Sequence, residues 1–283
     1  MININCPLCG GHLFEGEACG SCFAPAAVIE SIIYRDRPPK FVGVLGPSGV
    51  GKTVYLGMLL DLLSAAQAGC TDCHGTVLPA APPKFILALE QQRFPDKTPN
   101  EADRWAWVHC EVRTSKKGQV VDIVTPDVAG EAVMAELETP KSNPTIRSLI
   151  DRCAALVVLV DTVEVVGEGQ GQELFAMQLI SYLDTLRPGR RRGKVEVPVA
   201  IVFTKTDLCE GTIRDPENFA RSNAPALWRL CESRLKRFRF DCSGVAGSTG
   251  RLVDRDGRET LVPLRVEPRG VVEPFSWLMT QIY

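Results

Sequence analysis

The feature that most constrains the fold is the octapeptide from Gly46 to Thr53, which fits the pattern G-x-x-x-x-G-K-[ST]. Apolar residues 41–45 precede it and predict a buried strand, and residues 54–68 predict a helix directly after it. Glycines let backbone N–H groups curl around a phosphate, and the start of a helix adds unpaired donors. This context predicts a phosphate-binding loop rather than a glycine-rich turn without a ligand. The loop consists of Gly46, Pro47, Ser48, Gly49, Val50, Gly51, Lys52 and Thr53.

Strand-like and helix-like stretches alternate along the rest of the chain. Such alternation is typical of an α/β fold with a mostly parallel sheet that is flanked by helices. Gly118, beside two lysines, predicts a hairpin turn between two of the strands. We expect one P-loop domain over residues 40–283. The predicted strands are residues 41–45, 105–113, 119–124, 154–160 and 197–203, and the predicted helices are residues 54–68, 84–92, 173–186, 224–238 and 271–282.

Two downstream segments indicate which nucleotide the loop holds. The first, Asp127-Val128-Ala129-Gly130, follows an apolar strand and offers a carboxylate for a Mg²⁺ water and a glycine N–H for a γ-phosphate. The second, Thr204-Lys205-Thr206-Asp207, follows residues 197–203. A carboxylate at Asp207 can accept hydrogen bonds from guanine N1–H and N2–H₂, a donor pair that adenine lacks, while the Lys205 stem can stack on the base. Ordinary strand-end loops are the alternative for both segments, and guanine is favoured.

Four of the eleven cysteines lie within the first 22 residues, as two C-x₂-C pairs. Four thiolates in this arrangement predict a closed, structural Zn²⁺ site in a small ribbon over residues 1–33, with residues 34–39 as a linker. Iron is the chemical alternative. No Lys or Arg precedes Arg35, so the ribbon is expected to contact protein rather than nucleic acid. The predicted zinc ligands are Cys6, Cys9, Cys19 and Cys22.

The phosphate loop, D-x-x-G and T-K-x-D occur in this order at intervals of roughly 80 residues. In this respect the chain resembles the Ras-like P-loop GTPases of the translation-factor-related class. The cysteine-rich head, the segment Asp127–Glu131 and the segment Pro268–Pro274 resemble in particular the prokaryotic double-GTPase-like proteins, which are predicted to act in conflict or defence systems. The resemblance implies a GTP/GDP switch with a protein partner, for which a second GTPase and an activating protein are the candidates.

The resemblance also implies roles for single residues. Lys52, Thr98, Gly130 and Glu131 would support hydrolysis, with Glu131 in the place of the water-orienting residue. Thr53, Thr98 and Asp127 would hold Mg²⁺; a solvated turn threonine is the alternative for Thr98. The base would be bound by Thr204, Lys205 and Asp207. Ser243 and Gly244 match, more weakly, the loop that contacts the guanine carbonyl in Ras-like GTPases.

Four positions depart from the usual Ras-like pattern. Thr204 stands where Asn ties the base loop to the phosphate loop, and Glu131 stands where Gln orients the water. Ser48 replaces a glycine, and its Cβ is expected to crowd the path of an arginine finger. Gly49 replaces the Asn of potassium-dependent GTPases, so potassium assistance is not supported. Because the Glu131 carboxylate repels the γ-phosphate, we expect slow hydrolysis.

Composition narrows the function classes further. The net charge of −2 means that the chain lacks the excess of basic residues that is typical of general nucleic-acid-binding proteins. The longest apolar run, Cys153–Val160, is far shorter than the roughly 20 residues of a membrane span, and the N-terminus lacks a signal-peptide pattern, so a cytoplasmic protein is expected. The alternative functions are a non-hydrolysing nucleotide-binding scaffold and a nucleic-acid-associated GTPase that reads through its ribbon. We also expect GTP binding to survive deletion of residues 1–33.

Overall fold

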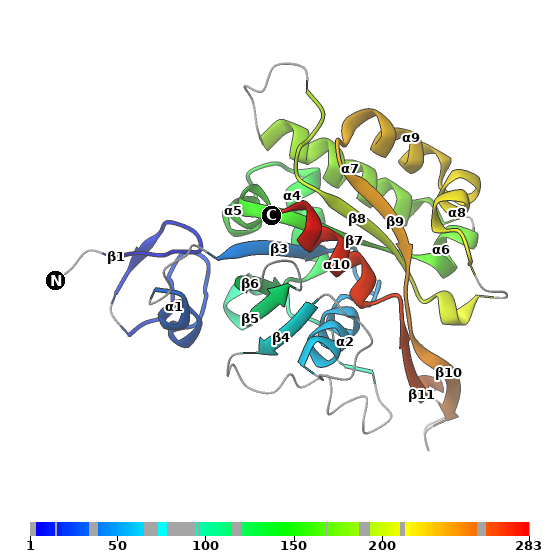
Figure 1. The fold of residues 1–283 in the computed structure, drawn as a ribbon, viewed down its shortest axis with the longest axis horizontal. Coiled ribbons are helices and arrows are strands. Elements are labelled where there is room, and N and C mark those ends of the chain that lie inside the picture. Colours follow the sequence, from blue (N-terminus) through cyan, green and yellow to red (C-terminus); the bar gives the residue numbers. More distant parts are fainter. Residues whose placement is uncertain are drawn as a thin grey trace.

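In the computed structural model, the central element is a seven-stranded sheet with strand order β4-β5-β6-β3-β7-β8-β9 (Figure 1). Six of these strands share one direction, and only β5 runs the other way within this sheet, antiparallel to both of its neighbours, β4 and β6. This arrangement confirms the predicted mostly parallel sheet and the pairing of the two predicted hairpin strands. The strands are β3 (Lys40–Leu45), β4 (Cys73–Val77), β5 (Ala106–Thr114), β6 (Val120–Asp127), β7 (Cys153–Asp161), β8 (Val199–Thr204) and β9 (Phe238–Cys242).

Several predicted features lie outside the residues that the structure describes. They are most of the linker, the helix over residues 84–92, the last four residues of the helix 54–68, and the turn around Gly118. The described residues are 4–14, 16–33, 39–64, 73–77, 94–95, 97–114, 120–167, 169–186, 193–209, 213–253 and 259–282.

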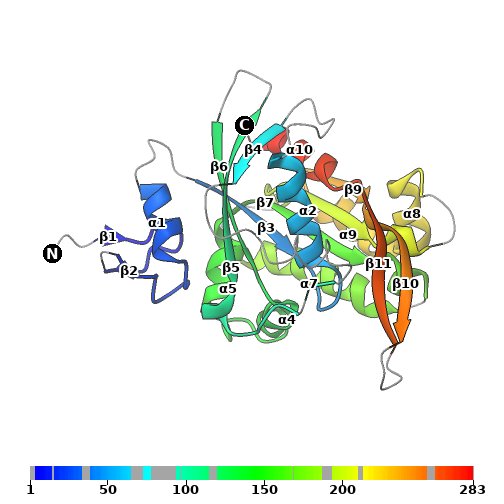
Figure 2. The same cartoon turned by 90° about the horizontal axis from the view of Figure 1, so that it is seen from below.

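Helices cover both faces of the sheet (Figures 1 and 2). Along β3, Phe41 and Leu45 join one apolar cluster, whereas Val42 and Val44 join the cluster on the opposite face. This alternation follows from the period of two in a strand and explains why the central strands are apolar throughout. α2 and α10 pack on the Val42 face, and α4, α5, α7 and α9 pack on the Phe41 face.

Among the predicted helices, α2, α7 and α10 are confirmed with small shifts of their ends. The helix predicted over residues 224–238 is wrong at its end, because α9 stops at Arg234 and residues from Phe238 form β9 beside β8. Among the described helices, none is long and apolar enough to cross a membrane. Within the described residues, the α-helices of this domain are α2 (Lys52–Ser64), α4 (Gly130–Glu138), α5 (Pro144–Arg152), α6 (Thr162–Val166), α7 (Gln170–Leu186), α8 (Pro216–Asn223), α9 (Pro225–Arg234) and α10 (Val272–Gln281).

An antiparallel hairpin lies between β9 and α10. Its strands are β10 (Gly244–Val253) and β11 (Glu259–Arg269), and they form a sheet of their own. Figures 1 and 2 show the hairpin projecting from the body of the domain, away from the N-terminal module. Its base packs against the 3₁₀-helix η2 (Thr206–Leu208). The hairpin thus begins at the segment that sequence analysis assigns to base binding.

The N-terminal module consists of β1 (Ile4–Asn5), β2 (His12–Leu13) and α1 (Ala26–Ile33). The apolar face of α1, with Val28 and Ile32, belongs to the same buried cluster as Trp105 and Trp107 beside and within β5. Ser31 Oγ lies 2.6 Å from His109 Nδ1 across this contact. Arg152 of α5 donates to the Cys9 carbonyl at 2.9 Å, and Thr145 donates to the Ser21 carbonyl at 3.0 Å. The module therefore shares its core with the α/β domain.

Candidate nucleotide-binding site

The predicted phosphate loop connects β3 to α2, as the sequence pattern requires. Gly49 and Gly51 have φ angles of 77° and 93°, a region that side chains rarely allow. Lys52 begins α2, and its Nζ donates to the carbonyls of Gly46 at 3.0 Å and Pro47 at 2.9 Å. Burial lowers the pKa of Lys52 to about 8, against the opposing charges of Asp127 and Glu131. The loop thus holds a nearly enclosed ammonium group, for which burial outweighs the attraction of the two nearby carboxylates.

Gly130 fits tightly against the phosphate loop. It is the first residue of α4, and a Cβ at this position would lie 2.4 Å from Ser48 N and 2.5 Å from Pro47 C. Both atoms belong to backbone, so neither can rotate away. The close approach explains the glycine of D-x-x-G and places the start of α4 directly beside the loop.

Three oxygen atoms converge beside Lys52. Asp127 Oδ2 accepts from Thr53 Oγ1 at 2.9 Å and from Thr98 Oγ1 at 3.0 Å, and the two hydroxyl oxygens are 3.0 Å apart. Burial raises the pKa of Asp127, against the hydrogen bonds from the two threonines. Octahedral Mg²⁺ with bonds of about 2.0–2.1 Å places neighbouring oxygens about 2.9 Å apart, so this donor set fits Mg²⁺. The structure thereby brings Thr98, chosen from sequence alone, to the other two predicted residues.

Glu131 lies at the same end of the cavity, with its side chain 44% exposed. Interaction with the Ser48 hydroxyl is the largest cause that lowers the pKa of Glu131, with smaller contributions from the charges of Lys97 and Lys52. Lys97 Nζ is 4.0 Å from Glu131 Oε1. Two of the sequence departures, Ser48 and Glu131, thus line the same cavity and influence each other.

The segment that is predicted to bind the base follows β8. Thr204 Oγ1 donates to the Val50 carbonyl of the phosphate loop at 2.8 Å, so the shorter hydroxyl does join the two loops. Lys205 adopts a left-handed conformation with φ 58°, and its Nζ forms a 2.5 Å ion pair with Asp161 at the end of β7. Asp161 is 4% exposed and was not predicted. The sequence shows Asp161 only as a single carboxylate at the end of an apolar strand, and no motif spacing distinguishes it from other acidic residues at strand ends.

Asp207, Ser243 and the start of β10 line the end of the cavity opposite the phosphate loop. Asp207 Oδ2 accepts from the Ala246 N–H at 3.1 Å, and burial raises the pKa of this carboxyl. Ser243 N donates to the Phe203 carbonyl at 2.7 Å, and a Cβ on Gly244 would lie 2.9 Å from Asp207 Oδ1. Ser243 and Gly244 are therefore adjacent to Asp207, as predicted from the weaker match.

One cavity of about 330 Å³ joins these groups and is large enough for a small-molecule ligand. Phosphate-loop residues and Lys97, Thr98, Gly130 and Glu131 line one end, and Thr204, Lys205 and Asp207 line the other. Sequence analysis missed several lining residues, because three of them lie on the unpredicted strand β10. The missed residues include Phe94, Pro95, Leu208, Val245, Ala246 and Thr249.

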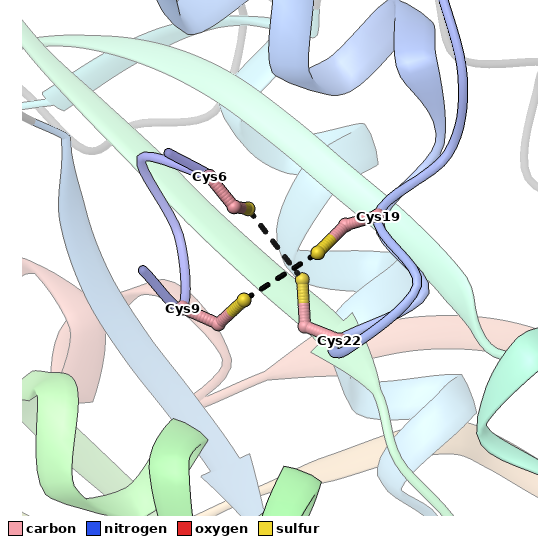
Figure 3. Close-up of side chains that lie close together, drawn as sticks. All are labelled: Cys6, Cys9, Cys19 and Cys22. Carbon is pink, nitrogen blue, oxygen red and sulfur yellow. Dashed lines mark hydrogen bonds between the residues drawn. The ribbon is translucent and has the colours of Figure 1, made fainter. Parts of the chain in front are cut away.

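The four predicted cysteine ligands converge in the N-terminal module (Figure 3). Their sulfur atoms all lie within 4.8 Å of one another, with Cys6–Cys22 at 3.8 Å and Cys9–Cys19 at 3.5 Å. A tetrahedral zinc site with Zn–S bonds of about 2.3 Å requires sulfur atoms about 3.8 Å apart, so the cluster fits structural Zn²⁺. The hydrogen bonds with Cys6 and Cys9, and then burial, raise the pKa of the Cys22 thiol, so four thiolates need a cation here.

Comparison with known proteins agrees with this geometry. The family model described as Double-GTPase 2 matches residues 40–250, about three quarters of the chain. Among curated proteins, none matches the chain. The match includes the phosphate loop, Asp127–Glu131 and Thr204–Asp207, and it supports a GTP-binding GTPase domain. With its N-terminal four-cysteine cluster, the chain is a double-GTPase-like protein, and it belongs to the Double-GTPase 2 family.

Proposed function

We propose that the chain binds GTP with Mg²⁺ in the cavity described above, hydrolyses it slowly, and acts as a switch for a protein partner. The observation that carries this proposal is the convergence of Thr53, Thr98 and Asp127 beside Lys52. Thr98 is separated from the phosphate loop by more than forty residues, so its position depends on a segment that a nucleotide can order or release.

Phosphate binding uses groups that are already placed. The Lys52 ammonium, now held by two loop carbonyls, is the nearest cation for the β- and γ-phosphates. The start of α2 contributes backbone N–H donors and the positive end of the helix dipole. Thr53, Thr98 and Asp127 would hold Mg²⁺, which supplies positive charge to the phosphate oxygens when bound.

Hydrolysis requires a water molecule in line with the γ-phosphorus. The water oxygen forms a bond to phosphorus as the bond to the β–γ bridging oxygen breaks; GDP leaves with that electron pair, and the water proton passes to the phosphate product. We assign the orientation of this water to Glu131, with backbone contact to the γ-phosphate from Gly130. The carboxylate adds negative charge beside the phosphate, and for this reason the intrinsic rate is expected to be slow.

The N-terminal module is the proposed contact for the partner. We treat residues 1–33 as the ribbon, residues 34–39 as the linker and residues 40–283 as the GTPase domain. Phe14 is 69% exposed and Phe23 is 36% exposed on the ribbon, and no Lys or Arg lies within it. Exposed aromatic groups without basic neighbours favour a protein surface over a nucleic-acid backbone. A second GTPase or an activating protein is the partner we propose.

The test measures base choice and turnover separately. Calorimetry should give tighter binding of GTP than ATP, and Asp207→Asn should shift the preference towards xanthine nucleotides, whose carbonyl accepts where guanine donates. Single-turnover release of phosphate from bound GTP then separates a GTPase from a scaffold. Equal affinities for GTP and ATP would contradict the guanine assignment, and tight GTP binding without phosphate release would favour the non-hydrolysing scaffold.

A further inference from the structure

Lys97 is a cation at the hydrolysis end of the cavity that no sequence motif identified. Its Nζ lies 4.0 Å from Glu131 Oε1, and the residue lines the same cavity as Ser48, Lys52 and Thr98. We propose that Lys97 is a positioning residue that, together with Ser48, holds Glu131 in place and offsets its negative charge during GTP hydrolysis. This inference rests on the proposed function.

The electrostatic problem at this site is specific. A water-orienting glutamine is neutral, whereas Glu131 brings a carboxylate next to a phosphate that is itself anionic. Two like charges near a protein surface repel each other, and a cation 4.0 Å from one of them reduces this repulsion; because the side chains of Lys97 and Glu131 are 82% and 44% exposed, solvent screens the pair and the reduction is small. Lys97 provides that cation from within the same chain.

Groups on two different segments act on the carboxylate. Lys97 Nζ lies 4.0 Å from Glu131 Oε1 on the segment that leads to β5, and Ser48 of the phosphate loop lines the same cavity and lowers the pKa of Glu131. Ser48 and Glu131, which both depart from the Ras-like pattern, therefore act as a pair. A glycine at position 48 would remove the donor, and a glutamine at position 131 would remove the need for the lysine.

The position of Lys97 depends on its neighbour in sequence. Thr98 Oγ1 bonds to Asp127 Oδ2 at 3.0 Å and lies 3.0 Å from Thr53 Oγ1, which fixes the backbone next to Lys97. When Thr98 is hydrogen-bonded to Asp127, Lys97 lies close to Glu131. When Thr98 loses this contact, Lys97 moves away from Glu131 together with it. The conformation of the segment that contains Thr98 therefore determines whether a cation lies beside the Glu131 carboxylate.

A matched ion pair elsewhere provides the control. Lys236 and Glu196 are also 4.0 Å apart, with side chains 63% and 48% exposed, but they do not line the cavity. Exposed pairs of this kind contribute little to stability, so neither lysine substitution should unfold the protein. A difference between Lys97→Gln and Lys236→Gln would then reflect position rather than the loss of a surface lysine.

The experiment is a double-mutant cycle on the full chain. Single-turnover hydrolysis of prebound GTP is measured for wild type, Lys97→Gln, Lys97→Arg, Glu131→Gln, Lys97→Gln with Glu131→Gln, and Lys236→Gln. Affinities for GTP, GDP and GDP–aluminium fluoride, a mimic of the transition state, are measured beside the rates. We expect Lys97→Gln to hydrolyse about two- to fivefold more slowly and to bind the mimic more weakly by the same factor, with GTP and GDP affinities unchanged.

Further expected results support an action through Glu131. Lys97→Arg should retain the wild-type rate, Lys236→Gln should change nothing, and Lys97→Gln should have no effect in the Glu131→Gln background. Equal slowing in both backgrounds would overturn the inference, because Lys97 would then act on the phosphate itself. A wild-type rate for Lys97→Gln would overturn it while leaving the GTPase proposal intact. If wild type releases no phosphate, the proposed function and this inference fail together.

Discussion

The close contact between Gly130 and the phosphate loop makes the sharpest prediction. In Gly130→Ala, the new Cβ would meet Ser48 N at 2.4 Å, Pro47 C at 2.5 Å and the Gly46 carbonyl oxygen at 2.9 Å. Ordinary contact requires about 3.4 Å or more, so the loop and the start of α4 must move apart by about 1 Å. All three neighbours are backbone atoms, so no side-chain rotation can relieve the overlap.

Two quantities should change in this variant. Overpacking of this kind costs about 1–3 kcal/mol of unfolding free energy, which corresponds to a decrease in Tm of about 2–12 °C in a domain of this size class. A displacement of about 1 Å at the hydrolysis end should also slow GTP turnover by about 100-fold. Thermal unfolding followed by circular dichroism and single-turnover hydrolysis measure the two effects.

Gly171→Ala is the matched control, because a Cβ at this α7 position would meet nothing within 4 Å. Alanine favours a helix over glycine by up to about 1 kcal/mol, so this variant should be as stable as wild type or slightly more so. The reasoning is refuted if Gly130→Ala unfolds within about 1 °C of wild type and hydrolyses GTP at the wild-type rate, since the loop and α4 would then not be in contact.

Three other predictions follow from described features. Glu131→Gln should preserve or raise single-turnover hydrolysis, whereas Glu131→Ala should lower it without loss of GTP binding; an unchanged rate for the alanine variant would remove Glu131 from water positioning. Purified protein should contain about one Zn²⁺ per chain by elemental analysis, and Cys19→Ser should lose most of it; a metal-free wild type purified without chelators would contradict this. Asp241 lies buried in β9, where its Oδ1 forms a 2.6 Å ion pair with Arg239; burial nevertheless raises the pKa of this carboxyl from 3.8 to about 6, so its contribution to stability is present below pH 3.8 and is lost as pH rises through about 6. Denaturant unfolding should therefore show Asp241→Asn to be more stable than wild type near pH 7 but not near pH 4. A difference in unfolding free energy between the two proteins that does not depend on pH would contradict the raised pKa of Asp241.

The strands and the position of the phosphate loop between β3 and α2 were largely predictable, because each depends on local pattern. Residues 41–45 and 154–160 are apolar throughout, and both became central strands covered on two faces. The site motifs follow strand ends, and the carboxyl ends of neighbouring parallel strands meet at one edge of a sheet. Thr98 lies beside Asp127 for a related reason, since it precedes a strand that runs beside β6.

Other features depend on signals that were overlooked or on contacts distant in sequence. α5 and α8 begin with Asn143-Pro144 and Asp215-Pro216, a cap residue followed by proline at the first helical position, which does indicate a helix start. Phe238 and Phe240 alternate with polar residues, so a strand pattern was present at the end of the predicted helix. The contact between Lys97 and Glu131 has no sequence signal, because it arises only when the chain segments pack together.

The packing of α1 against β5 affects the order in which the chain folds. Roughly 75 residues separate Ile33 from Trp107, so at about 5–20 residues per second the ribosome needs about 4–15 s to supply the surface that covers α1. A segment of this size seldom maintains a core without a metal or a disulfide. If the four-cysteine cluster takes up zinc as soon as it emerges, the nascent chain would wait as a folded ribbon rather than as an exposed apolar segment that is prone to aggregate.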